Sequence, residues 1–242
     1  MIAIISQARI NSSRLPNKIF LEAAGKPFLL HHIERLEKTK LPIIIATTNN
    51  GSEIPIVEFC EKKGLQYYKG DEEDVLKRYY EAAKHFNITT VIRVTSDCPL
   101  IDPGIILSGL ARYQSLPGNT FFSNALKRTY PRGMDYEIFS FDLLKHAFLH
   151  ANKKPDREHV TPYISGNRSG NVNIVHDIQQ DDSSIFRITL DTKEDQELIT
   201  KLMQEYDASN LDCREIVEIL KNNPHLSEIN KFIEQKKYDE SV

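Results

Sequence analysis

Short apolar runs rich in β-branched residues alternate with helical patterns along the first half of this chain, and this alternation restricts its possible folds most strongly. Each run is bounded by polar or turn-forming residues and is long enough for a buried strand. Between the runs, apolar side chains recur at helical spacing, as Leu29, Ile33 and Leu36 do. Strands and helices in this order predict parallel βαβ units with right-handed crossovers. The predicted strands are residues 2–5, 43–48, 65–70 and 89–94, with helices after Pro27, before Gly64 and after Asp71.

The second half of the chain is less regular. Residues 136–139 alternate in polarity as an antiparallel or edge strand would, and FRITLD at 186–191 is predicted to be the last strand. No linker rich in Pro, Gly or Ser separates two halves, so we expect one α/β domain with a mixed sheet and a helical C-terminal appendage. The other predicted elements are a strand at 121–124 and helices at 105–114, at 141–151, from a cap at Asp156 to Val160, and at 193–206, 212–222 and 225–237.

Charge balance, the length of apolar runs and the placement of cysteines together exclude several classes of protein. The 242 residues include 31 Lys and Arg against 34 Asp and Glu, without the basic excess of a nucleic-acid-binding protein. No apolar run approaches the roughly 20 residues that cross a bilayer, and Arg9 interrupts the first apolar stretch too early for a signal peptide. The three cysteines are scattered, which favours neither a disulfide framework nor a zinc site. We expect a cytoplasmic protein that acts on small molecules and binds neither nucleic acid nor membrane.

A basic loop follows the first predicted strand. The segment QARINSSRLPNK holds the cations Arg9, Arg14 and Lys18, with the hydroxyls of Ser12 and Ser13 between them. Ligands of open α/β sheets bind beyond the carboxyl ends of strands, and cations, hydroxyls and backbone N–H groups there suit a polyphosphate. A solvated basic loop is the alternative interpretation. The glycine patterns of a Rossmann dinucleotide site and of a P-loop are both missing from the sequence.

Three aspartates stand just beyond predicted strands. Asp97 and Asp102 lie in the loop after the fourth strand, and Asp191 ends the last one. Asp97 and Asp191 could share one Mg²⁺ beside a triphosphate, because hard cations take carboxylate oxygens as ligands. Helix capping is the alternative for all three, and we favour it for Asp102 because Pro103 follows at the first helical position.

Two segments of the second half, RTYPRGMDYEIFS and DREHVTPYISG, are polar and aromatic in similar measure and could line a pocket for a hydroxylated or anionic acceptor. Local structural roles are the alternative. Asp156 could cap a helix, with Arg157 and Glu158 in its solvated first turn. His159 could be a hydrogen-bonded structural histidine. The candidate pocket residues are Arg128, Tyr130, Arg132, Asp135, Arg157, Glu158 and His159.

A series of motifs gives the chain a resemblance to a known family. They are QARINSSRLPNK, GKP, GDEEDVLKRYYEAA, RVTSDCPLIDP, RTYPRGMDYEIFS, DREHVTPY and ITLDTKED, in that order. The chain resembles the cytidylyltransferase-like family that includes spore coat polysaccharide biosynthesis protein F, and more distantly the acylneuraminate and 3-deoxy-manno-octulosonate cytidylyltransferases. The resemblance implies a nucleotide-diphospho-sugar transferase fold, a Rossmann-like three-layer α/β fold with a mixed, mainly parallel sheet. Residues 1–207 would form the nucleotidyltransferase domain, and 208–242 a helical appendage of the same domain without an assigned function.

The resemblance also implies a reaction and gives roles to the candidate residues. The reaction is Mg²⁺-dependent transfer of CMP from CTP to an acidic or surface-polysaccharide sugar, with release of pyrophosphate, in a family whose members are often homodimers. Asp97 and Asp191 would bind the metal, and Arg78 would lie near the nucleobase. Arg9, Lys18 and Asp97 would be catalytic; Arg9, Ser12, Ser13, Arg14 and Lys18 would hold the triphosphate; Arg132, Asp135, Glu158 and His159 would face the sugar.

The chain departs from the family pattern at several positions. Asn11 and Asn17 stand where relatives usually have glycine, and asparagine is among the few residues that tolerate positive φ. A glycosyltransferase of the same fold that consumes a nucleotide sugar is one alternative function, but Pro99 replaces the second aspartate of its Asp-x-Asp motif. A non-catalytic subunit that binds nucleotide sugars is another. It would tolerate loss of the metal aspartates, yet both are present.

Overall fold

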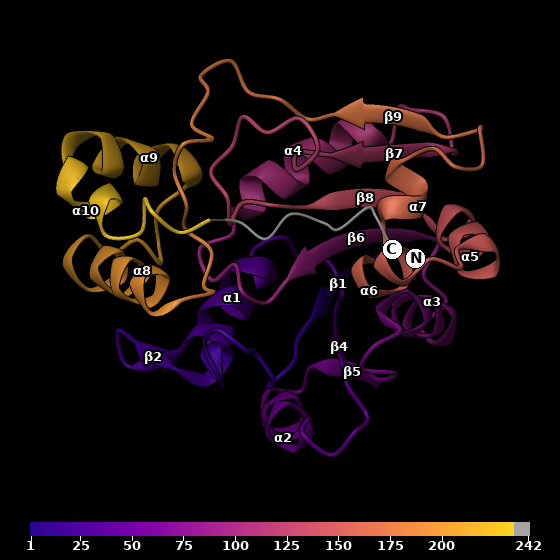
Figure 1. Ribbon diagram of the computed structural model, residues 1–242, viewed down its shortest axis with the longest axis horizontal. Coiled ribbons are helices and arrows are strands. Elements are labelled where there is room, and N and C mark those ends of the chain that lie inside the picture. Colours follow the sequence, from indigo (N-terminus) through magenta and orange to yellow (C-terminus); the bar gives the residue numbers. More distant parts are fainter. Residues whose placement is uncertain (235–242) are drawn as a thin grey trace.

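A seven-stranded sheet in the order β5-β4-β1-β6-β8-β7-β9 forms the centre of the computed structural model, which describes residues 1–234 (Figure 1). Helices pack on both of its faces and give three layers. The strands of this sheet are β1 (Ile2–Gln7), β4 (Ile43–Thr47), β5 (Gln66–Lys69), β6 (Thr90–Thr95), β7 (Thr120–Ser123), β8 (Glu137–Ser140) and β9 (Asn173–His176). The helices are α1 (Phe28–Glu37), α2 (Ile54–Lys63), α3 (Val75–His85), α4 (Pro103–Tyr113), α5 (Phe141–His150), α6 (Lys154–His159), α7 (Pro162–Ser165), α8 (Lys193–Glu205), α9 (Cys213–Asn222) and α10 (Pro224–Glu228). A short 3₁₀ helix, η1 (Lys18–Phe20), and a small hairpin of β2 (Glu22–Ala23) and β3 (Lys26–Pro27) precede α1.

The parallel half of the sheet is built around β1. This strand pairs in parallel with β4 on one side and with β6 on the other, and β4 pairs in parallel with β5. Because successive side chains of a strand point to opposite faces, Ile4 packs in one apolar cluster with Leu29 and Ile33 of α1. Ile5 packs in the opposite cluster with Leu76 of α3. The strands and crossover helices predicted for this half are confirmed.

Strand β8 reverses the direction of the sheet. It lies antiparallel to both β6 and β7, and β9 then pairs in parallel with β7 at the edge. The strands predicted at 121–124 and 136–139 are therefore confirmed as β7 and β8. The result is the mixed, mainly parallel sheet that the sequence predicts.

The prediction of a strand at 186–191 is wrong. This segment is extended, but its backbone bonds with loops: Ile188 N–H donates to Arg132 O (2.7 Å), and Leu190 N–H donates to Asp97 O (2.7 Å). An isolated bridge between Arg132 and Arg187 is the only strand-like pairing that the described residues give it. The last strand of the sheet is instead β9, which the sequence does not predict because its NIVH pattern is short and only half-buried.

Two predictions for helices in the second half also need correction. Asp156 does not cap its helix: α6 begins at Lys154, and Asp156 is a buried residue of its first turn that forms an ion pair with Arg168. Of the helix predicted at 225–237, only α10 is present in the described chain; it ends at Glu228, and residues 235–237 lie outside the described residues. The helices predicted at 105–114, 141–151, 193–206 and 212–222 are confirmed as α4, α5, α8 and α9.

The C-terminal helices pack against the rest of the chain through a third apolar cluster. Leu198 and Leu202 of α8 meet Ile216 of α9 there. Arg35 of α1 adds a polar connection, since its buried guanidinium donates to the carbonyls of Ile101, Ala208, Ser209 and Leu211. Among residues 1–234, no helix combines the length and the apolar character needed to cross a membrane.

Candidate functional site

One large cavity opens where the sheet's parallel strands end. Its volume is about 1610 Å³, and it is bounded by the loop after β1, the loop after β6, α3, and the α6–α7 region. Ligand sites of open α/β sheets occupy this position. The cavity brings together the sequence-predicted residues Arg9, Ser12, Ser13, Arg14, Lys18, Arg78, Asp97, Arg132, Glu158, His159 and Asp191.

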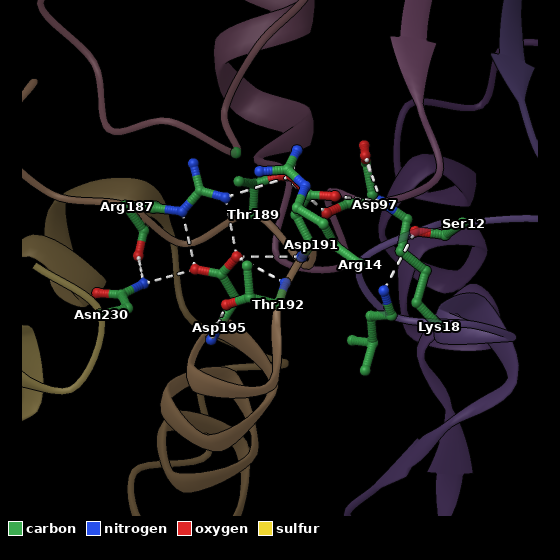
Figure 2. A network of polar contacts seen from close by, with 12 residues as sticks. Ser12, Arg14, Lys18, Asp97, Arg187, Thr189, Asp191, Thr192, Asp195 and Asn230 are labelled. Atoms are coloured by element: carbon green, nitrogen blue, oxygen red, sulfur yellow. Dashed lines mark hydrogen bonds and ion pairs between the residues drawn. The ribbon is translucent and has the colours of Figure 1, made fainter. Parts of the chain in front are cut away.

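Two aspartates and two cations meet at one end of the cavity, which we call the carboxylate end (Arg14, Lys18, Asp97 and Asp191; Figure 2). Lys18 Nζ lies 2.9 Å from Asp97 Oδ2 and 3.3 Å from Asp191 Oδ1. Arg14 forms an ion pair with the other carboxylate oxygen of Asp191. The two carboxylates therefore converge on one ammonium group, although they belong to loops far apart in the sequence.

The ionisation of this cluster follows from its pairing. Burial raises the pKa of Asp97, but the charge of Lys18 and hydrogen bonds from Thr95 and Lys18 outweigh burial and hold that pKa at about 2. Burial also lowers the pKa of Lys18, and the two carboxylates more than compensate, so its pKa is raised overall. At neutral pH the Asp97 carboxylate is thus ionised and the Lys18 ammonium group is charged.

Local backbone geometry aims Lys18 into the cluster. Asn17 adopts the left-handed conformation (φ 56°) at the start of η1, so the expectation that asparagine suits this position is confirmed. Asn11 does not have a positive φ. Its side-chain amide instead donates to Glu72 Oε1 (3.3 Å), which connects the basic loop to the segment before α3.

The capping alternatives have different outcomes for the aspartates. Asp102 accepts the Gly104 N–H (2.7 Å) as the N-cap of α4, as favoured from the sequence. Asp191 is not a cap. Thr192 is the N-cap of α8 and forms a capping box with Asp195, which leaves the Asp191 carboxylate free to face Lys18.

Arg78 of α3 lines the cavity, although only 2% of its surface is exposed. Its Nη1 donates to Asp71 O (2.8 Å), whereas its buried Nε–H has no hydrogen-bond partner among residues 1–234. Burial and, to a lesser extent, the charge of Arg9 lower the pKa of Arg78. A buried donor without a partner is costly, so Arg78 is suited to receive a polar ligand atom.

The opposite end of the cavity is formed by short helices, and we call it the α6–α7 end (Glu158, His159, Thr161 and Arg168). Val160 between them is fully buried and has φ 72° and ψ −54°, and Thr161 N–H donates to His159 O across it (2.8 Å). This is a tight γ-turn in a conformation that β-branched residues rarely adopt. It turns the chain so that the residues on both sides of Val160 line the cavity.

Some cavity residues were missed from the sequence. Glu137 is buried in β8, where it accepts from Arg93 Nη1 (2.8 Å) and from Thr161 Oγ1 (3.2 Å). A glutamate inside a strand pattern gives no sequence signal for this role. The other missed lining residues include Lys153, Thr161 and Arg168.

His159, which was predicted, has a lowered pKa because it is partly buried, although the charge of Glu158 acts in the opposite direction.

Asp135 differs from the other predicted sugar-facing residues because it does not line the cavity. Its carboxylate instead forms an ion pair with Arg128, whose side chain does line it. Arg128 therefore stands between Asp135 and the cavity. Arg132 does line the cavity, beside the bridge to Arg187.

The carboxylate end offers ligands to a divalent cation. Among residues 1–234, no group of three or more His, Cys, Asp or Glu side chains is arranged around a common point. Asp97 and Asp191 nevertheless converge on the Lys18 ammonium and present hard oxygen donors. Mg²⁺ is commonly held by one or two carboxylates together with substrate phosphates, so this pair fits such an ion when a triphosphate completes its coordination.

Comparison with known proteins decides the family. Residues 2–241 match the family described as Cytidylyltransferase. The chain belongs to the cytidylyltransferase family. A cytidylyltransferase of Leptospira borgpetersenii serovar Hardjo-bovis (strain JB197) has a similar solved structure, with TM-score 0.89, 30% identity, and coverage of 98% of this chain and 99% of that one. The family resemblance seen in the sequence is thereby confirmed.

Two relatives extend this comparison across nearly the whole chain. An uncharacterized protein of Methanocaldococcus jannaschii is 36% identical over 98% of this chain and 97% of its own length. The spore coat polysaccharide biosynthesis protein SpsF of Bacillus subtilis is 28% identical over 92% of this chain and 95% of its own. The cytidylyltransferase described here therefore has the nucleotide-transferase fold and is a nucleotidyltransferase.

Proposed function

We propose that this cytidylyltransferase activates a sugar by Mg²⁺-dependent transfer of CMP from CTP. The sugar hydroxyl attacks the α-phosphorus of CTP, the new bond is a phosphate ester to the sugar, and pyrophosphate leaves. The observation that carries the proposal is the convergence of Asp97 and Asp191 on Lys18 at the carboxyl edge of the sheet. Membership of the cytidylyltransferase family supports CTP as the donor.

In this proposal the basic loop binds the triphosphate. Arg9, Arg14 and Lys18 neutralise the charge that builds on the departing pyrophosphate, and Ser12 and Ser13 supply hydroxyl donors to its oxygens. Most of the rate enhancement comes from substrate positioning and charge stabilisation, because the protein forms no covalent bond with the substrates in this reaction. Asp97 and Asp191 hold Mg²⁺, which supplies Lewis-acid polarisation of the phosphate oxygens when it is bound.

Arg78 completes the donor site on the nucleobase side. Its Nε–H, which has no partner among the described residues 1–234, supports this assignment, because a bound nucleotide would provide an acceptor there. Gly70 allows the arginine to pack in place: a Cβ at that position would come within 2.9 Å of Arg78 Cγ.

The acceptor in this proposal is an acidic sugar that binds at the α6–α7 end. Cationic side chains line the cavity: Lys153 and Arg168 flank α6 and α7, and Arg132 lies beside Arg187. They favour a carboxylate on the sugar, while Glu158 and His159 offer hydrogen-bonding groups to its hydroxyls. Asp135 contributes indirectly, by holding Arg128. We place the reaction in the cytoplasm, where nucleoside triphosphates are made.

Thermal unfolding with nucleotides tests the donor. A ligand that binds only the folded state raises the melting temperature by mass action. We expect a Mg²⁺-dependent rise with CTP that exceeds those with UTP, GTP and ATP at equal concentration. A larger shift with another triphosphate would keep the reaction and change the donor, and no shift with any of the four would contradict the proposal.

A further inference from the structure

A buried carboxylate lies directly behind the carboxylate end. Asp195, in the first turn of α8, is completely buried and is not among the residues that line the cavity. Figure 2 shows it in polar contact with Arg187, Asp191 and Asn230. Its Oδ2 accepts the backbone N–H groups of Asp191 (3.1 Å) and Thr192 (3.0 Å). The backbone position of Asp191 is therefore set by Asp195.

Arg187 adds a second connection between the two aspartates. Its guanidinium binds Asp195 in a fork, with Nε to Oδ1 and Nη2 to Oδ2 both at 2.8 Å. The same Nη2 lies 3.6 Å from Asp191 Oδ2. A planar guanidinium held by one carboxylate presents its charge in a fixed direction, so Asp195 also controls the side-chain environment of Asp191.

The C-terminal segment supplies the remaining donor. Asn230, just beyond α10 and only 4% exposed, donates from Nδ2 to Asp195 Oδ1 (2.8 Å) and to Arg187 O (3.0 Å). This amide thus binds the backbone of Arg187 and the carboxylate that holds the Arg187 side chain. Removal of one donor from a buried carboxylate leaves an acceptor that water does not reach, and such groups rearrange to recover a partner.

We propose that Asn230 is a positioning residue for Asp191, so that the C-terminal segment fixes the carboxylate end through Asp195 and Arg187. The proposal rests on the proposed function in one respect, that Asp191 meets the metal and triphosphate. Partners behind a metal-binding carboxylate orient it, and their loss typically costs about 10- to 100-fold in metal affinity. A purely structural Asn230 would affect unfolding but leave metal-dependent binding unchanged.

The test compares three variants of the full-length chain. Asn230→Ala removes the donor, and Asn230→Asp keeps the shape of the side chain while it replaces the donor with an acceptor. Asn223→Ala is the matched control, because Asn223 Nδ2 donates to Ile219 O (2.9 Å) in the same C-terminal segment and makes no contact with Asp195. Calorimetric titration with CTP, in Mn²⁺ and in EDTA, measures binding, and circular dichroism checks the fold.

We expect Asn230→Ala to weaken CTP binding in Mn²⁺ by about 10-fold or more, with little change in EDTA, where the cations of the basic loop act alone. Asn230→Asp should weaken it at least as much, since its carboxylate faces Asp195. Asn223→Ala should match the wild type. Wild-type binding in either Asn230 variant would overturn the proposal, as would equal weakening with and without metal.

A crystal structure of Asn230→Ala without ligand gives an independent readout. We expect the Asp191 carboxylate to leave its position between Lys18 and Arg14. If Asn230→Ala does not fold, the same comparison is made with Asn230→Ser, which keeps a short donor. If the wild-type protein binds no CTP, the proposed function fails, and the crystal structure alone decides: an unmoved Asp191 overturns the positioning role, and a displaced one supports it.

Discussion

The two ends of the cavity are held together in different ways. At the carboxylate end, Lys18 pairs with aspartates that lie 79 and 173 residues away in the sequence. At the α6–α7 end, Arg168 pairs with an aspartate of α6 only twelve residues away. The carboxylate end therefore requires three segments from distant parts of the chain to meet. The α6–α7 end combines this local ion pair with a contact to the sheet, the hydrogen bond from Thr161 to Glu137 of β8.

This difference separates two requirements of the proposed reaction. In the proposal, triphosphate chemistry, which is common to all cytidylyl transfer, takes place where loops from distant parts of the chain meet. Recognition of the sugar, which is specific, is proposed for the short helices and the strained turn at Val160. We expect substitutions at the carboxylate end to abolish turnover, and substitutions at the other end to change the preferred acceptor.

The largest effect should come from Asp97→Asn at the carboxylate end. The change removes a charged metal ligand but preserves its shape, so we expect turnover to fall by about 10³-fold with the fold intact. Pyrophosphate release from CTP and an accepted sugar measures this loss. Asp102→Asn is the matched control, because that aspartate caps α4, and it should retain turnover. An active Asp97→Asn with unchanged metal dependence would refute the metal assignment.

The next effect concerns acid stability of the same end. His32 is fully buried between Ser6 Oγ and Cys98 O, and burial lowers its pKa from 6.5 to about 4. Below pH 6.5 the His32 imidazole is protonated in the unfolded chain, whereas in the folded chain it becomes protonated only near pH 4. Stability should therefore fall as the pH drops through this window, by up to about 3 kcal/mol. Urea unfolding from pH 7 to 4 measures it.

The control for this acid effect is His32→Gln, which keeps a hydrogen-bonding side chain without a titrating group. Its stability should depend less on pH across the same window, even if it is lower throughout. An identical pH dependence in the two proteins would show that other groups cause the acid loss.

Lys18→Met should have an intermediate effect. The variant loses the ammonium that both carboxylates share, so Asp97 and Asp191 repel one another and the triphosphate loses a cation. We expect CTP to bind about 10- to 100-fold more weakly. Added Mg²⁺ alone should stabilise the variant more than the wild type, because the ion relieves the repulsion. Calorimetry and melting temperatures measure both effects, and unchanged CTP affinity would contradict the role of Lys18.

The smallest effect should come from Asp135→Asn, which removes the ion-pair partner of the cavity-lining Arg128. Arg128 loses its charged partner and becomes less well ordered, so KM for the acceptor should rise about 2- to 5-fold. The affinity for CTP should not change. Initial rates at varied acceptor and varied CTP separate the two parameters, and a selective loss of CTP affinity would contradict a role of Arg128 in acceptor binding.

The sequence predicts the parallel half of the fold because burial on both faces makes its strands continuous apolar runs. It fails where a segment's partners lie elsewhere. FRITLD has the composition of a strand, but its backbone groups bond to the loops at Arg132 and Asp97. NIVH forms β9 at an exposed edge, where burial imposes little pattern.

The site divides in the same way. Arg9 and Asp97 could be found because they closely follow recognisable strands, and Lys18 because it belongs to the same basic loop as Arg9; such loops meet at one edge of a sheet. Asn230 could not be found, because its contact with Asp195 depends on where α10 ends in space. Glu137 is similarly hidden within β8, and its partner Thr161 depends on the γ-turn at Val160.

The proposed reaction is tested most directly by phosphorus NMR of the protein with CTP, Mg²⁺ and a panel of acidic sugars. We expect the triphosphate signals to be replaced by those of pyrophosphate and of one phosphodiester, with at least one sugar in the panel. The Asp97→Asn variant should give neither product. Absence of pyrophosphate with every sugar, together with transfer of the sugar from an added CMP-sugar to another acceptor, would contradict cytidylyl transfer and favour a glycosyltransferase.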